Sequence, residues 1–165
     1  MQKLINKSNQ FNLTTRRRHE PEVAAIEGSP DHFGLQFRLT DTFGDNGMIS
    51  VVVLEKDGHS MIIDTWLMSC RVLERGVEKA VLNEIIRIAK IVGVQRVIGE
   101  FIPSPRNEMV RDHYQRLGFS PVTGDENRFL WEMATATYDP LAVQIVVDRT
   151  SVHQVVELKA HRFAR

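Results

Sequence analysis

A change of hydrophobic period near residue 76 is the feature that most constrains the fold of this chain. Before it, apolar and polar residues alternate, as in GLQFRLTDTF, which is the period of a half-buried strand. Between residues 77 and 92, apolar residues fall at 77, 81, 85, 88 and 92, with Lys79, Asn83, Arg87 and Lys90 between them. This spacing places the apolar side chains in one stripe along about four helical turns. The sequence therefore predicts strands followed by a helix that packs on them.

The other segments predict further helices and strands. A short helix is expected from about Glu20 to Glu27, with Pro21 in its first turn and Gly28 as its stop. GLQFRLTDTF, MISVVVLEK and MIIDTWLMSC, separated by the turns GDNG and DGHS, form a β-meander. After the long helix come the strand VQRVIGEFI, an amphipathic helix over residues 107–117, the strand RFLWEMAT and the apolar run LAVQIVV. This order predicts an α/β fold in which helices pack on a mixed sheet.

The composition is that of one globular domain. A chain of 165 residues, 42% of them hydrophobic, supports one core of ordinary size. The 21 basic and 21 acidic residues cancel, so charge favours neither nucleic acid nor a membrane surface as partner. The single cysteine, Cys70, excludes an internal disulfide and a cysteine-built zinc site. With no stretch typical of a signal peptide or a membrane span, we expect a cytoplasmic protein.

The chain divides into three parts by composition. Residues 1–19 are rich in Asn, Gln, Thr and Arg and are predicted to be a linker or docking arm. Residues 20–138 form the domain, and residues 139–165 form a C-terminal strand and tail. The histidines show no metal-ligand spacing, so no metal is expected.

The order of elements resembles the acetyltransferase fold of the GNAT superfamily. VLERGVEKAVL follows a meander strand, and RNEMVRDHYQRLGF follows the next strand. The resemblance implies a mostly antiparallel sheet with helices on both sides, in which the strand before the main helix splays from its neighbour. It also implies that the loop into this helix holds the pyrophosphate of coenzyme A on backbone N–H groups, as a helix N-terminus can. Asn107, Tyr114, Gly118 and Phe119 match positions of the fold's second helix.

A closer resemblance covers nearly the whole chain. INKSNQFNLTTRR, FGDNGMISV, SCRVLERGVE and GEFIPSPRNEMVRDHYQRLGF are similar, in this order, to the C-terminal half of FkbH-like proteins. The resemblance implies a GNAT-like domain that works with a haloacid-dehalogenase-like catalytic domain, upstream or in trans. That family loads a glyceryl unit onto the phosphopantetheine of an acyl carrier protein. The Asp-x-Asp-x-Thr motif of the catalytic half does not occur here, so the phosphoryl chemistry is not carried over.

The predicted phosphate loop departs from the GNAT pattern. That pattern has Arg or Gln, two residues, Gly, one residue, then Gly or Ala; aligned on Gly76, it places Leu73 at the first position and Glu78 at the last. A carboxylate about 4 Å from a phosphate repels it by roughly 4 kcal/mol, more than the 0.3 to 2 kcal/mol of helix-dipole attraction. If Glu78 points at the site, coenzyme A binds weakly; if it turns outward, the loop still works.

Several residues around this loop are candidates for a site. Val72, Gly76 and Val77 would offer backbone N–H groups to acetyl-coenzyme A or to carrier-protein phosphopantetheine. Arg71 and Arg75 could contact its phosphate, or simply pair with neighbouring glutamates.

The catalytic candidates each have an alternative role. Cys70 could be a nucleophile or a small core residue. Tyr114 is either the general acid for a thiolate or part of the packing, and Glu100 on VIGEF is either a base or a buried, paired carboxylate. The resemblance adds Asn107 as a cofactor contact.

Three functions remain open from the sequence. The chain could be the GNAT-like domain of a glyceryl-loading protein that binds an acyl carrier protein for polyketide or other secondary-metabolite biosynthesis. It could be an active acetyl-coenzyme A transferase, or a structural module whose apolar run LAVQIVV pairs with a neighbour's sheet.

Overall fold

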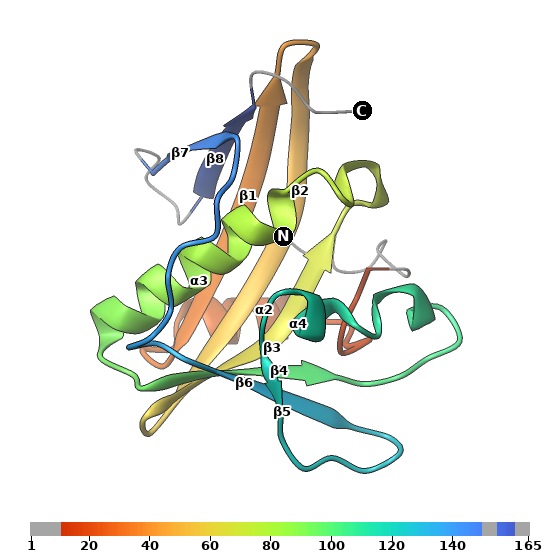
Figure 1. The fold of residues 1–165 in the computed structure, drawn as a ribbon, viewed down its shortest axis with the longest axis vertical. Helices are drawn as coiled ribbons and strands as arrows, with labels where there is room; N and C mark the ends of the chain where they lie inside the picture. The colour runs from red at the N-terminus through yellow and green to blue at the C-terminus, as the bar shows by residue number, and fades with distance from the viewer. Residues whose placement is uncertain (1–10, 150–154, 161–165) are drawn as a thin grey trace.

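The computed structural model describes residues 11–149 and the strand at residues 155–160. Its strands are β1 His32–Asp41, β2 Gly44–Asp57, β3 Ser60–Met68, β4 Arg96–Phe101, β5 Ser120–Pro121, β6 Phe129–Ala134, β7 Ile145–Asp148 and β8 Val155–Ala160. They form one sheet in the order β5-β6-β4-β3-β2-β1-β8-β7 (Figure 1). The pairs β3–β4 and β1–β8 are parallel and the other neighbours antiparallel, which confirms the mixed, mostly antiparallel sheet.

Helices cover both faces of this sheet, as predicted. The helices are α2 Glu20–Glu27, α3 Val77–Val92 and α4 His113–Arg116, with the 3₁₀ turns η1 Cys70–Val72 and η2 Glu108–Val110. Val51 and Leu67 pack with Val23 of α2, whereas their chain neighbours Val52 and Trp66 belong to the core that includes α3. Because successive side chains of a strand point to opposite faces, α2 and α3 lie on opposite sides of the sheet (Figure 1).

The helix predicted over residues 107–117 is broken into two short pieces. The structure has only the η2 turn and the single helical turn of α4 there. The side-chain oxygen of Asn107 accepts a hydrogen bond from the N–H of Ser104 at 2.8 Å, and its Nδ2 donates to the carbonyl of Ile102 at 2.9 Å. Such local side-chain bonds compete with a continuous helix, so the prediction of one helix was wrong.

The C-terminal part extends the chain's own sheet. β8 pairs with β1, and β7, which contains the last three residues of LAVQIVV, lies at the sheet edge beyond it. Asn83 of α3 fixes the connection, because its Oδ1 accepts from the N–H of Leu141 at 2.8 Å and its Nδ2 donates to the Leu141 carbonyl at 2.9 Å. The end of the run predicted to pair with a neighbour thus pairs within this domain's own sheet. In the described part of the chain, no helix is both long and apolar enough to cross a membrane.

α4 packs closely on β4 through one glycine. A Cβ atom added to Gly99 would lie 2.4 Å from the ring of Tyr114. The ring therefore rests directly on the backbone of β4, and this contact fixes the distance between α4 and the sheet.

We predict that Gly99→Ala destabilises the fold by roughly 1 to 3 kcal/mol, because the buried ring has no room to retreat. Urea unfolding followed by circular dichroism measures the change. Gly28→Ala is the matched control: Gly28 has φ −89° and an added Cβ would lie 3.5 Å from its nearest neighbour. A Gly99→Ala protein as stable as the control would contradict the contact.

Candidate functional site

β3 and β4 are paired over only part of their length. Ser60–Ile63 of β3 pairs with Arg96–Gly99 of β4, and the pairing stops there. Backbone from the N-terminal side of the chain fills the opening beyond. We call residues 11–18 the N-terminal arm.

The N-terminal arm hydrogen-bonds to both parted strands. The Leu13 N–H donates to the Trp66 carbonyl at 3.4 Å, and the Met68 N–H donates to the Phe11 carbonyl at 3.3 Å. On the other side, the Ile102 N–H donates to the Leu13 carbonyl at 2.8 Å. The arm therefore continues the sheet across the opening.

Residues 11–14 of the arm are buried in the domain. Phe11 is 2% exposed and Leu13 is fully buried, and both belong to the main hydrophobic core. Of the predicted linker or docking arm, residues 11–18 thus dock on this domain itself, while residues 1–10 lie outside the described residues.

A β-bulge marks the point where the strands part. Val53 of β2 faces Thr65 and Leu54 faces Ile63, so Asp64 is the extra residue of β3. Its carbonyl accepts hydrogen bonds from Thr14 Oγ1 at 3.0 Å and from the Arg16 guanidinium at 2.9 Å. The bulge removes this carbonyl from the β2–β3 ladder and offers it to the arm.

Glu100, the predicted base, is paired with arginines on both of its oxygens. Its carboxylate is 3% exposed; Arg16 lies 3.0 Å from Oε2 and the Arg128 Nε lies 2.5 Å from Oε1. Arg16 also contacts the carboxylate of Asp64, which pairs with Arg18 as well. The carboxylate of Glu100 therefore has a structural role, because it holds the arm through Arg16.

Asn107, predicted to contact a cofactor, binds the arm instead. Besides its bonds to Ser104 and Ile102, its Nδ2 donates to the Asn12 carbonyl at 2.9 Å. Asn107 is fully buried, so both amide protons and the oxygen are used within the domain.

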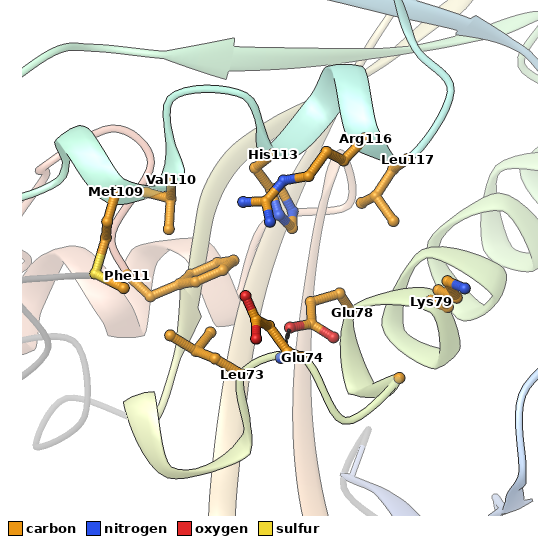
Figure 2. A pocket seen from close by; sticks show the side chains of 11 residues that line it. Phe11, Leu73, Glu74, Glu78, Lys79, Met109, Val110, His113, Arg116 and Leu117 are labelled. Carbon is orange, nitrogen blue, oxygen red and sulfur yellow. Dashed lines mark hydrogen bonds between the residues drawn. The ribbon is translucent and has the colours of Figure 1, made fainter. Parts of the chain in front are cut away.

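A pocket of about 270 Å³ lies between the loop before α3 and the η2–α4 segment (Figure 2). Its wall is largely apolar, with two carboxylates from the loop, Lys79 from α3 and Arg116 from α4. Figure 2 shows Glu74 and Glu78 extending from the loop toward the side that carries His113 and Arg116. The lining residues are Phe11, Leu73, Glu74, Gly76, Glu78, Lys79, Met109, Val110, His113, Arg116 and Leu117.

Glu78 turns toward the loop and binds it. Its Oε1 accepts a hydrogen bond from the N–H of Glu74 at 2.8 Å (Figure 2). Gly76 has φ +81° and Glu74 has φ +61°, a left-handed conformation that is uncommon outside glycine. At least one backbone N–H of the loop is thus bonded to the carboxylate of Glu78. In the GNAT pattern, the backbone N–H groups of this loop remain free to bind a phosphate.

The remaining loop candidates lie outside the pocket wall. Val72 and Val77 are buried in the core and hold the two ends of the loop. Arg71 and Arg75 are exposed, and Arg71 donates to the hydroxyl of Ser69 at 3.2 Å. Cys70 is exposed on η1, so the alternative of a small core residue was wrong, and its role as a nucleophile stays a prediction.

Tyr114 points into the core. Its ring packs against Trp66 and Phe119, and its hydroxyl has no hydrogen-bond partner among the described residues. Burial, and after it the nearby carboxylate of Glu100, raise the pKa of Tyr114. Tyr114 does not line the pocket. Its role as a general acid for a ligand in this pocket therefore stays a prediction.

His113 is one of the pocket residues that the sequence did not single out. It is 4% exposed, it lines the pocket, and its Nε2 atom has no hydrogen-bond partner in the described part of the chain. The available signal was its spacing, because Val110, His113 and Leu117 follow the i, i+3, i+7 pattern of one helical face.

Solved structures share the fold of this chain. The ribosomal-protein-S18-alanine N-acetyltransferase from Escherichia coli matches with a TM-score of 0.60 at 13% identity, over 84% of this chain and 87% of that chain. The GNAT domain of S. lividans PAT matches with a TM-score of 0.56 at 17% identity, over 72% and 70%. This chain has the GNAT fold. At such identity the likeness shows the fold and not the activity.

The other comparisons add no information about function. A Desulfovibrio desulfuricans protein described as GNAT-family matches at 14% identity with a TM-score of 0.48, over 55% of this chain and 64% of that one. This chain thus spans less than two thirds of that protein, and the match is too weak to bear on function. No protein-family model matches the sequence, and no curated protein does. The FkbH-like resemblance therefore stays a prediction.

We predict that Glu78→Gln raises the affinity for coenzyme A roughly tenfold at low salt, because it removes a charge beside the pocket. The glutamine oxygen can still accept from the Glu74 N–H, so the loop keeps its shape. Titration calorimetry measures the change. Glu27→Gln, on α2 at the opposite face, is the control and leaves the affinity unchanged. Equal affinities for Glu78→Gln and the unaltered protein would show that Glu78 does not oppose the anion.

Proposed function

We propose that this chain is a binding module of GNAT fold that holds the phosphopantetheine arm of an acyl carrier protein. In this proposal a partner domain, of the haloacid-dehalogenase-like kind, performs the loading of a glyceryl or related acyl unit. The observation that carries the proposal is the filled opening between β3 and β4. The N–H groups of Met68 and Ile102 and the carbonyl of Trp66, which face this opening, are bonded to residues 11–13.

The filled opening makes acyl transfer between the parted strands unfavourable. A ligand lying there would displace three backbone hydrogen bonds and expose Phe11 and Leu13. Burial of two such side chains stabilises a fold by about 3 to 6 kcal/mol, which would weaken the ligand by roughly two to four orders of magnitude. The candidate groups for acid–base chemistry are also engaged or buried, as Glu100 and Tyr114 illustrate.

The pocket beside the arm suits a slim, mostly apolar ligand with a phosphate at one end. Its volume of about 270 Å³ is below the usual range of roughly 300 to 1,000 Å³ for ligand pockets, so it fits an arm better than a whole nucleotide cofactor. Leu73, Met109 and Leu117 offer apolar contacts. Lys79 and Arg116, which pairs with Asp112 at 2.9 Å, offer cationic groups for a phosphate.

The sequence resemblance supports the choice of partner. The block INKSNQFNLTTRR, one of the four shared with FkbH-like proteins, contains the residues that fill the opening in this chain. The part of that block that fills the opening therefore has a structural role within the GNAT-like domain. This role does not require the transfer of an acyl group. A carrier protein is the partner that brings phosphopantetheine to such a domain in that family.

An active acetyl-coenzyme A transferase is the second candidate. The GNAT fold and the pocket beside the N-terminus of α3 favour it. It requires the arm to leave the opening between β3 and β4, which the bonds of Phe11 and Leu13 oppose.

Calorimetry with a phosphopantetheinylated carrier protein, together with a thiol-release assay with acetyl-coenzyme A, tests the proposal. We expect binding of the carrier protein and no thiol release above background. Leu73→Trp, which fills the pocket, should abolish binding, whereas Ile91→Trp, at a position 72% exposed on α3, should leave it intact. The proposal would be contradicted if the purified chain catalysed thiol release. It would also be contradicted if the Leu73→Trp protein bound the carrier protein as tightly as the unaltered chain.

A further inference from the structure

His113 is held rigidly at the wall of the pocket. It is the first residue of α4, and its ring meets the rings of Phe11 and Trp66 edge-on, at centroid distances of 4.8 and 4.5 Å. Figure 2 shows the imidazole extending from α4 toward the side of the pocket where Phe11 and Glu78 lie. Its orientation is therefore set by aromatic packing, and one of these aromatic partners belongs to the N-terminal arm.

The Nε2 atom of this ring is buried and unpartnered among the described residues. Buried polar atoms of native proteins nearly always have a hydrogen-bond partner, so an exception calls for an explanation such as an absent ligand. Packing alone does not explain it, because a phenylalanine would make the same edge contacts without an unsatisfied nitrogen.

The imidazole is neutral in this environment. Burial, helped by the positive charge of Arg116, lowers the pKa of His113 to about 3. A neutral ring offers either a donor or an acceptor at Nε2, depending on the tautomer. It can thus form a hydrogen bond with an uncharged polar group without a charged partner.

We propose that His113 determines which ligand this pocket takes, by a hydrogen bond from or to Nε2 with an amide or hydroxyl group in the middle of an apolar chain. The inference rests on the proposed function and deepens it. A pantetheine arm has this chemistry, since amides and a hydroxyl interrupt its apolar segments, whereas a fatty acyl chain lacks it. Val110 and Leu117, which line the same pocket, are apolar and offer such a ligand no competing hydrogen bond.

Two probes separate this role from general pocket shape. Phosphopantetheine carries the amides and the hydroxyl, and decyl phosphate, used below its micelle concentration, carries only an apolar chain and a phosphate. His113→Phe removes the nitrogen and keeps a ring; His113→Gln keeps a donor and an acceptor. Calorimetry gives the affinities, and the nitrogen resonances of ¹⁵N-labelled histidine report the state of Nε2.

We expect His113→Phe to weaken phosphopantetheine binding roughly tenfold or more and to leave the binding of decyl phosphate unchanged. His113→Gln should keep part of the affinity for phosphopantetheine. The Nε2 resonance should shift on addition of phosphopantetheine. The free His113→Phe protein should melt at the same temperature as the unaltered one or above it, because no hydrogen bond is lost.

Different failures are distinguishable. Unchanged phosphopantetheine affinity in His113→Phe overturns the inference and leaves the proposed function standing. Equal losses for both probes, with a lower melting temperature, show a structural role for His113 and also overturn it. If the unaltered chain binds neither phosphopantetheine nor the carrier protein, the proposed function fails and the inference fails with it.

Discussion

The structure depends on a segment of its own backbone lying between two strands that part. Residues 11–13 bond to β3 on one side and to the end of β4 on the other, so the sheet continues across an opening that would otherwise expose unpaired backbone groups. The main features near the site follow from this. The bulge at Asp64 releases a carbonyl for the arm, Asn107 binds the arm's backbone, and Phe11 forms part of the pocket wall.

Charge strengthens the same arrangement. Glu100 and Asp64 are carboxylates at the parting of the strands, and Arg16 contacts both, with Arg128 completing the pairing of Glu100. A buried carboxylate of this kind is tolerated because it is paired and hydrogen-bonded, and removing one partner leaves an uncompensated charge. Glu100, the predicted base, is here used to hold the arm in place through Arg16. This pairing is part of the reason why we propose binding rather than transfer.

The sequence predicted the elements well and their long-range contacts poorly. The meander and α3 follow from local periodicity, and the pairing of Glu100 was one of its two predicted roles. The position of residues 11–14 was not predictable, because the alternation of FNLT covers only four residues and their partners lie far along the chain. Asn107 ties the η2–α4 segment to the arm through the Asn12 carbonyl, and the burial of His113 depends on Phe11; neither contact is local.

The hydrogen exchange of three backbone amides tests the account most directly. The amides of Leu13, Met68 and Ile102 make the bonds that join the arm to the two strands. Measured by NMR under native conditions, they should be protected to the same degree as the central amides of β2 and β3, because they open only with the sheet. Exchange of these three amides at the rate of an exposed coil, with β2 still protected, would contradict the account and leave the opening free for a ligand.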